Sequence, residues 1–302
     1  MKKIVAITGV GTYPVPWLEY GIASIYNHVD EIVVVNSGYN FPLFTEYDVP
    51  LPEVSSMLRE IDENGKIHEI QQVTWEKVAK YGNEIDRNRE GIRALGMTYA
   101  NDIAGYELGA DWILKFDSDQ VFFPNVKNIR ELVKDDTPDG YQFLEYKSYH
   151  ISPQTMAVGR EAQDVSHNDG TKLYKFPGQN GKRQYFYGEG AITHYREQAP
   201  SDAVTTAHLR ECYPLRNGTH DYQGLFLNYF QRMLFHSYDQ GRLYRKTKKE
   251  YDKTFDEMIV YAFESAKHRI FGNYEIVPAN PKPPEVIEIG AKRYIEREES
   301  YV

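Results

Sequence analysis

Two aspartates at the end of an apolar run are the residues of this sequence whose type and spacing most suggest chemistry. Asp117 and Asp119 flank Ser118 and follow Ile113–Phe116, a stretch with the character of a buried strand. Burying a carboxylate without a partner is strongly unfavourable. At a strand end the chain turns, so both carboxylates can reach one point, and two such oxygen ligands suit Mg²⁺ or Mn²⁺. The pattern predicts a metal site; the alternative is a turn whose aspartates accept hydrogen bonds from nearby N–H groups.

The elements that must position this pair can be read from the hydrophobic pattern. Two stretches carry apolar residues at helical spacing, residues 18–29 and 88–108. They separate three runs that predict buried strands: Ile4–Thr8, Glu31–Val35 and Asp111–Phe116. Such alternation predicts an α/β fold with a mostly parallel sheet and helices on both faces. Ligands of these sheets bind beyond the carboxyl ends of the strands, where Thr8, Asn36 and the aspartate pair are expected to lie.

The rest of the chain gives weaker signals. Residues 40–65 are rich in Pro, Asp and Glu and are expected to form a long surface excursion. Two further strands are expected at Lys66–Val73 and Tyr141–Tyr149, and residues 150–220 mix glycine, aromatic and charged residues without a regular period. Helical spacing returns over residues 221–236 and 250–268, before prolines interrupt regular structure from Pro278 onward.

Composition limits the classes of protein that this chain can belong to. The sequence has 302 residues, a net charge of −9 and one cysteine, Cys212. The acidic balance argues against a dedicated nucleic-acid-binding protein, and one cysteine forms no disulfide within the chain. We expect neither a secretory signal nor a membrane-spanning run, and therefore a cytoplasmic protein. The basic stretch Arg242–Lys253 could contact an anionic membrane face, although a solvated helix surface is the simpler interpretation.

The order of these segments resembles a known family. The runs "KIVAITG", "EIVVVNSG", "NREGIRALGMTYANDIA" and "GADWILKFDSD" are similar to the GT-A nucleotide-sugar-dependent glycosyltransferases, closest to family 2, over about residues 3–135. The resemblance implies a Rossmann-like GT-A sheet and transfer of a hexose from a nucleoside-diphosphate sugar to an acceptor hydroxyl, with inversion. Together with the hydrophobic pattern of the later residues, it divides the chain into three expected parts: a nucleotide-sugar-binding core (1–135), an acceptor-side part (136–236), and a C-terminal helical segment with an extended tail (237–302).

The resemblance further assigns site residues. The aspartate pair holds Mn²⁺ or Mg²⁺ against the donor diphosphate, and Ser118 lies with it. The end of the first strand contacts the donor through Thr8 and Gly9, and the end of the second through Asn36 and Ser37. The helix before the aspartate motif contributes Arg89 and Arg93. The family commonly has an aspartate where this chain has Asn36, which leaves the base open.

Two roles in the second half are assigned with alternatives. For a histidine in the metal site we prefer His208, in "TTAHLREC", over His194 and His220, and an ordinary hydrogen-bonded histidine is the other interpretation. An inverting transfer needs a carboxylate base. Glu189, between two glycines, is the first choice; a solvated turn is equally compatible, and the competitors are Asp202, Glu211 and Asp221.

The donor partner is thus a nucleotide-sugar, and the acceptor is a glycan, a lipid-linked molecule or a protein. Three rival functions stay open. "TGVGTYP" resembles the glycine-rich loop of sugar nucleotidyltransferases of related fold, without the arginine expected where Tyr13 stands. "ILKFDSDQV" fits the haloacid-dehalogenase-like phosphatases, in which Asp117 would be the nucleophile. A binding module that keeps the fold without turnover is the third.

Overall fold

The computed structural model describes only part of the chain: residues 1–10, 18–36, 52–82, 89–118, 120–122, 129–134, 140–146, 149–152, 155–159, 166–176, 196–198, 205–208, 257, 259–264 and 274–278. Side chains of residues 89–94, 144–172 and 196–208, among others, lie outside this description even where the backbone is given. The chain divides into two units, residues 1–147 with 165–208, and residues 148–164 with 209–302. The three parts predicted from the sequence stay a prediction.

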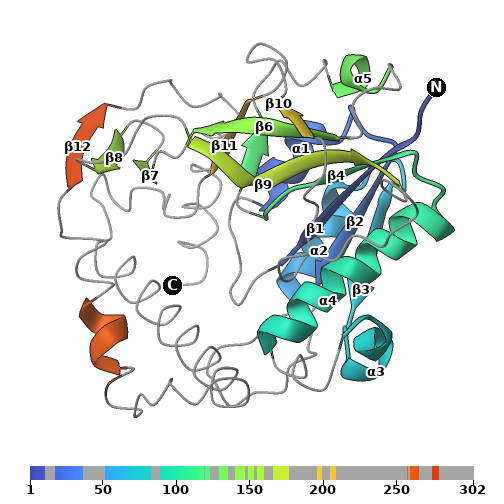
Figure 1. Ribbon diagram of the computed structural model, residues 1–302, viewed down its shortest axis with the longest axis horizontal. Helices are drawn as coiled ribbons and strands as arrows, with labels where there is room; N and C mark the ends of the chain where they lie inside the picture. The colour runs from blue at the N-terminus through green and yellow to red at the C-terminus, as the bar shows by residue number, and fades with distance from the viewer. Residues whose placement is uncertain are drawn as a thin grey trace. The chain divides into compact units, whose positions relative to one another are not determined.

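The first unit is built on a nine-stranded sheet of order β3-β2-β1-β4-β9-β6-β11-β5, with β10 beside β6 (Figure 1). The first four strands in this order are parallel, and β10 and β11 are parallel to β6. The antiparallel pairs are β4 with β9, β6 with β9, and β5 with β11. The predicted α/β fold with a mostly parallel sheet is therefore confirmed. The strands are β1 (Ile4–Gly9), β2 (Glu31–Asn36), β3 (Ile67–Gln71), β4 (Trp112–Lys115), β5 (Gln120–Phe122), β6 (Gly140–Tyr146), β9 (Ser166–Lys175), β10 (Arg196–Gln198) and β11 (Thr205–His208).

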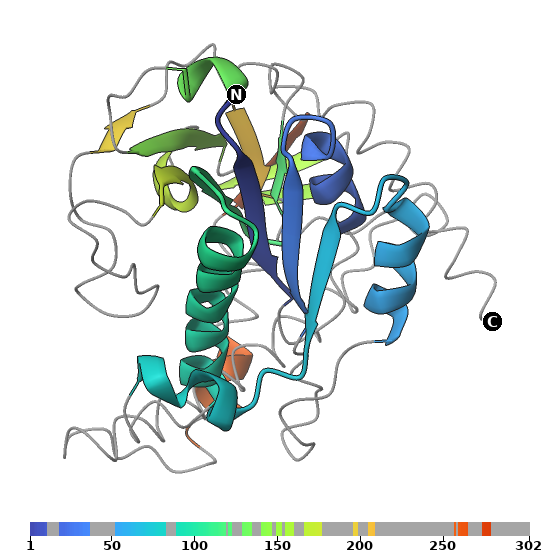
Figure 2. The same ribbon diagram turned by 90° about the vertical axis from the view of Figure 1, so that its right-hand side faces the viewer.

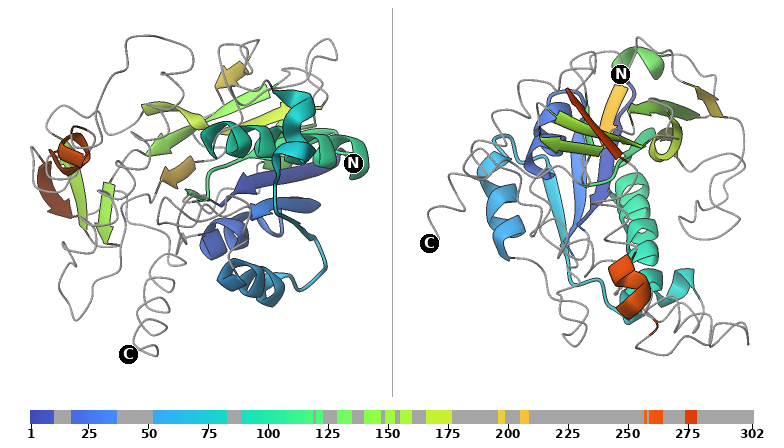
Figure 3. Two further views of the ribbon diagram at one scale, coloured as in Figure 1. Left: turned by 90° about the horizontal axis from the view of Figure 1, so that it is seen from below. Right: turned by 90° about the vertical axis from the view of Figure 1, so that its left-hand side faces the viewer.

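Helices cover both faces of β1 and β2, as Figure 2 and the left view of Figure 3 show. One face packs against α1 (Leu18–Ile25), α2 (Pro52–Ile61) and α5 (Ile129–Leu132). The other packs against α3 (Trp75–Val78) and α4 (Arg89–Asp102), which are followed by the short helical segments η1 (Ala79–Tyr81) and η3 (Ile103–Glu107). Because both faces are covered, β1 and β2 are apolar almost throughout, as is typical of central parallel strands.

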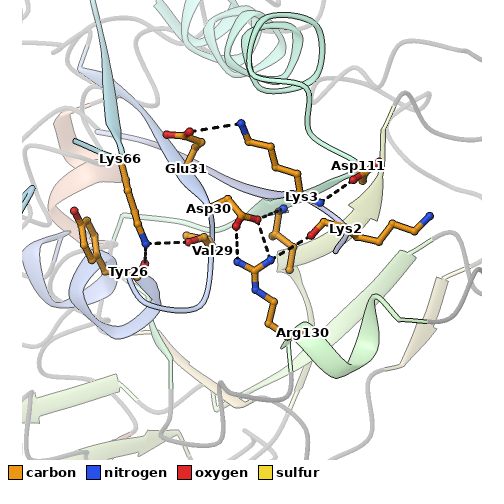
Figure 4. Close-up of polar contacts among 10 residues, drawn as sticks. Lys2, Lys3, Tyr26, Val29, Asp30, Glu31, Lys66, Asp111 and Arg130 are labelled. Atoms are coloured by element: carbon orange, nitrogen blue, oxygen red, sulfur yellow. Dashed lines mark hydrogen bonds and ion pairs between the residues drawn. The ribbon is translucent and has the colours of Figure 1, made fainter. Parts of the chain in front are cut away.

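The amino ends of the strands are fixed by charged groups (Figure 4). Asp30 accepts hydrogen bonds from the Ile4 N–H at 2.7 Å and from two nitrogens of Arg130 at 2.9 Å each. The Lys3 N–H donates to Asp111 at 2.7 Å. Burial alone would raise the pKa of Asp30, but the bonds from Arg130 and Ile4 and the charge of Arg130 together hold that pKa below its usual value. At the amino edge of the sheet, these charged side chains are therefore satisfied by groups of the protein itself.

Two regions differ from the sequence expectation. Residues 40–65 were expected to be a surface excursion, yet α2 occupies Pro52–Ile61, with Val54 and Leu58 buried in the core. Those two residues lie four apart, on one face of the helix, so the polar composition around them hid a helical period. Within residues 150–220, which lack a regular period, β9 and β11 nevertheless join the central sheet. Their places depend on pairing with distant strands, which no local pattern reports.

The second unit contains a three-stranded sheet of order β12-β8-β7. Its strands are β7 (Tyr149–Ser152), β8 (Thr155–Gly159) and β12 (Tyr274–Pro278), all antiparallel to their neighbours. Residues 259–264 are helical, within the helix predicted over 250–268, and the helix predicted over 221–236 lies outside the described residues. In the part of the chain that the structure describes, every helix is too short or too polar to cross a membrane.

Candidate functional site at the carboxyl edge of the sheet

Backbone hydrogen bonds bring the carboxyl ends of the parallel strands to one edge of the sheet. β1 lies between β2 and β4, with Thr8 opposite Val34 and Ile7 opposite Lys115. The ladder continues beyond the strands, because the Phe116 N–H donates to the Ile7 carbonyl at 3.1 Å. Thr8 and the aspartate motif therefore emerge at the edge where α/β sheets bind ligands.

The aspartate motif forms a tight turn that Gln120 closes. The Gln120 N–H donates to the Asp117 carbonyl at 3.0 Å, and the Asp117 N–H donates to the side-chain oxygen of Gln120 at 2.7 Å. Asp117 is half-buried, and Ser118 is 8% exposed. No hydrogen bond or ion pair within the described residues engages the Asp117 carboxylate. A half-buried carboxylate without such a partner is suited to binding a cation.

The strand that carries His208 runs beside this turn. β11 pairs antiparallel with β5, and the register sets His208 opposite Gln120, the residue after Asp119. The backbone thus places two of the predicted ligands, Asp117 and His208, around the same short segment. Asp119 itself and the His208 side chain lie outside the description, and the side chains that are described hold no cluster of three metal-ligating groups.

Thr8 is the described residue whose polar group is most conspicuously unsatisfied. Its side chain is 0% exposed, and its hydroxyl has no hydrogen-bond partner within the described part of the chain. Native proteins pair nearly all buried polar atoms, so such a hydroxyl needs an explanation. A ligand at the carboxyl edge would supply the partner. The next residue, Gly9, is closely packed, because a Cβ there would lie 2.8 Å from the Met97 sulfur.

Asn36, at the end of β2, belongs to a polar cluster that sequence analysis did not foresee. Its side-chain nitrogen donates to Glu69 at 2.6 Å and to the Ser55 hydroxyl at 3.2 Å. Ser55 donates to the same Glu69 oxygen at 2.5 Å, and the Gln71 amide donates to the other at 3.0 Å. An aspartate at position 36 would bring a second carboxylate against Glu69. The neighbour on β3 therefore gives a physical reason for the asparagine.

The other predicted site residues are placed less fully. Arg89 and Arg93 belong to α4, whose Gly96 and Met97 pack on this side of β1 and β2, but the two arginine side chains are not described. Ser37 and Glu189 lie outside the described residues. Gln120 and Glu69 were missed by sequence analysis. The one available signal was Gln120, a polar residue opening the apolar run that ends at Phe123.

Comparison with protein-family models and with curated proteins finds no match. Among solved structures, the chain is similar to a 4-diphosphocytidyl-2C-methyl-D-erythritol synthase from Anaerococcus prevotii, at 11% identity and a TM-score of 0.31, covering 97% of this chain and 96% of that one. It is also similar to the galactosyltransferase LgtC, at 13% identity and 0.29, covering 57% of each chain. A third is the glycosyltransferase GlyE from Streptococcus pneumoniae, at 15% identity and 0.30, covering 58% of this chain and 34% of that one. Likeness at this level assigns the chain to no family, so we base its function on its own residues.

Proposed function

We propose that this chain is a metal-dependent glycosyltransferase of the GT-A type, which transfers a sugar from a nucleoside-diphosphate sugar to an acceptor hydroxyl. The observation that carries the proposal is the Asp117–Gln120 turn at the carboxyl edge of the sheet, where the Asp117 carboxylate makes no hydrogen bond or ion pair with another described residue. A carboxylate presented in this way at a ligand-binding edge is expected to serve a cation or a substrate.

The residues present fit a hard divalent cation. Asp117, Asp119 and His208 would hold Mn²⁺ or Mg²⁺, since two carboxylates and an imidazole are ligands that such ions accept. The ion, when bound, neutralises charge on the departing diphosphate. It also offsets the acidity of a chain with net charge −9 toward an anionic donor.

The chain's own groups would orient the donor. The buried Thr8 hydroxyl lacks a described partner and offers a hydrogen bond to the nucleotide. Gly9 at the end of β1 and Ser37, the residue that follows β2 in the sequence, would contact the donor, and Arg89 and Arg93 on α4 would pair with phosphate oxygens. Because Asn36 is fully buried and donates to Glu69, we assign it a structural role at this edge of the sheet.

The acceptor hydroxyl attacks the anomeric carbon as the bond from that carbon to the diphosphate oxygen breaks. Glu189 would take the hydroxyl proton as general base. Attack from the face opposite the leaving group gives inversion. Product analysis by NMR reads the anomeric configuration directly, and a retained configuration would contradict this assignment of Glu189.

The proposal is tested by thermal shift with a panel of nucleotide-sugars and Mn²⁺. For wild type we expect one nucleotide-sugar to raise Tm by a few degrees in a Mn²⁺-dependent manner. Asp117→Asn should abolish that shift and lower turnover on the order of a hundredfold or more, since metal catalysis supplies several kcal/mol and each 1.36 kcal/mol is a factor of ten.

Asp111→Asn is the matched control, because it makes the same change beside the opposite end of β4. It should keep the full Mn²⁺-dependent shift. If Asp117→Asn keeps the shift as well, the metal role of Asp117 is wrong. Release of pyrophosphate from a nucleoside triphosphate and a sugar phosphate would instead indicate a nucleotidyltransferase, and an aspartyl-phosphate trapped at Asp117 a phosphatase.

A further inference from the structure

Gln120 is a fully buried polar residue whose side chain makes an unusual contact. It is the first residue of β5 and is 0% exposed. Its side-chain oxygen accepts the Asp117 N–H at 2.7 Å, while its own N–H donates to the Asp117 carbonyl at 3.0 Å. The turn is thus closed twice between the same two residues. A backbone-only turn would have the second of these bonds alone.

The segment that carries Gln120 is itself anchored by α1. A Cβ on Gly21 would lie 2.5 Å from the Gln120 carbonyl oxygen, so the helix backbone lies directly against this residue. One turn later, the Ser24 hydroxyl accepts the Phe122 N–H at 3.2 Å. β5 is therefore held by α1 on one side and by β11 through backbone pairing. Gln120 links this anchored segment to the peptide group of Asp117.

From these contacts we propose that Gln120 is a positioning residue, which fixes the backbone of Asp117 so that the carboxylate is held ready for a divalent cation. This inference rests on the proposed metal site. The direction of a carboxylate is set by the backbone that carries it, and groups that orient a metal ligand typically contribute about ten- to a hundredfold to metal affinity. The Gln120 amide supplies the Asp117 N–H with an acceptor, which an apolar side chain of similar shape could not do. Its presence here is better explained by the orientation of Asp117 than by packing.

The decisive variant is Gln120→Met, which keeps the length of the side chain and removes the oxygen that accepts the Asp117 N–H. Mn²⁺ binding is measured by the loss of the free-ion signal in electron paramagnetic resonance, without any nucleotide or acceptor. We expect the affinity of Gln120→Met for Mn²⁺ to fall about tenfold. Turnover of this variant should recover at high Mn²⁺ concentration, whereas turnover of Asp117→Asn should not.

The matched control is Phe122→Leu, which truncates another buried side chain of the same strand without touching the turn. It should lower Tm and leave Mn²⁺ affinity unchanged. If Gln120→Met and Phe122→Leu give the same Mn²⁺ affinity as wild type, the inference about Gln120 is overturned while the metal site stands. If wild type binds no Mn²⁺, or binds it equally well as Asp117→Asn, both the proposed function and this inference fail.

Hydrogen exchange of the Asp117 amide gives a readout that does not depend on metal. That N–H loses its acceptor in Gln120→Met, so its exchange should quicken at least tenfold relative to the Leu114 amide within β4. In Phe122→Leu the two amides should keep their wild-type ratio. Unchanged protection of Asp117 in Gln120→Met would show that the side chain does not hold this peptide group, and would overturn the inference even if Mn²⁺ affinity fell.

Discussion

The charged groups at the amino ends of the four parallel strands are paired, whereas two polar groups at the carboxyl ends of β1 and β4 are not paired with any described residue. At the amino edge, Asp30 is bound by Arg130 and the Ile4 N–H, and Lys3 reaches Glu31 at 3.5 Å. At the carboxyl edge, the Thr8 hydroxyl and the Asp117 carboxylate find no hydrogen-bond or ion-pair partner among the described residues. Paired charges stabilise the fold, whereas unpaired polar groups are kept in a fold chiefly where function uses them. From this contrast we expect the amino-edge cluster to serve stability and Thr8 and Asp117 to serve binding, whereas the Asn36–Glu69 cluster of the carboxyl edge is paired.

The largest stability effect is expected at the amino edge, from Asp30→Ala. This change removes the acceptor of the Ile4 N–H and of both Arg130 bonds at once. Bonds to charged groups contribute about 1.5–3 kcal/mol each, but the Asp30 side chain is 38% exposed, so we expect a total loss of about 2 kcal/mol. Urea unfolding measures the loss, and nucleotide and Mn²⁺ binding should stay as in wild type.

A surface ion pair is the control for that change. Lys134 pairs with Glu131 on α5, and both side chains are more than half exposed. Lys134→Ala should therefore cost less than about 0.5 kcal/mol. A similar loss from Lys134→Ala and Asp30→Ala would mean that the amino-edge cluster is no stronger than an ordinary surface pair.

At acid pH, wild type and Asp30→Ala should have the same free energy of unfolding. The pKa of Asp30 is lowered in the folded state, so its contribution is fully present above the unfolded value of about 3.9 and is lost as pH falls through the folded pKa. Wild type and Asp30→Ala should thus converge in free energy of unfolding below about pH 4. A constant difference from pH 7 to pH 3 would contradict the role of the carboxylate charge.

The next effect is at the carboxyl edge, where Asn36→Asp should destabilise the fold by about 1–2 kcal/mol at pH 7. The new carboxylate would face Glu69, whose oxygen is 2.6 Å from the Asn36 amide, and like charges at that distance raise a pKa by one unit or more. Thermal unfolding measures the loss. Adding Glu69→Gln should restore stability, because an amide can donate to the new aspartate. Equal loss in the single and double variants would mean that charge repulsion is not the cause.

The sequence pattern and the structure agree where the signal is local, and they diverge where the signal depends on distant residues. The strand beginning at Ile4 and the helix beginning at Leu18 follow from apolar spacing. The pairing of His208 with Gln120 does not, because a strand of four residues finds its place only through the long-range ladder. The Gln120 side chain and the Asn36–Glu69 contact likewise join residues whose relation depends on turns and register. The aspartates could be named as candidates from the chain, and their role stays a prediction, but the residues that the fold brings beside Asp117 could not be named.

The smallest effect is also the one that best separates the two edges. Thr8→Val replaces the buried hydroxyl by a methyl group of the same shape. Since that hydroxyl has no described partner, its removal relieves a desolvation cost, and we expect unfolding free energy to stay level or rise by up to about 1 kcal/mol. The affinity for the nucleotide should fall about tenfold, as when a ligand loses one hydrogen bond inside a protein.

Ile7→Val tests whether that result is particular to the hydroxyl. Ile7 is the preceding residue of β1, is fully buried and packs on the opposite face of the sheet. Losing one methylene there should cost about 0.5–1.5 kcal/mol and leave nucleotide affinity unchanged. The two neighbours would then respond in opposite directions, stability falling at one and binding falling at the other. Thr8→Val could instead lower stability as Ile7→Val does and bind nucleotide normally. The Thr8 hydroxyl would then contribute to stability and not to binding, and the proposed functional difference between the two edges would be wrong.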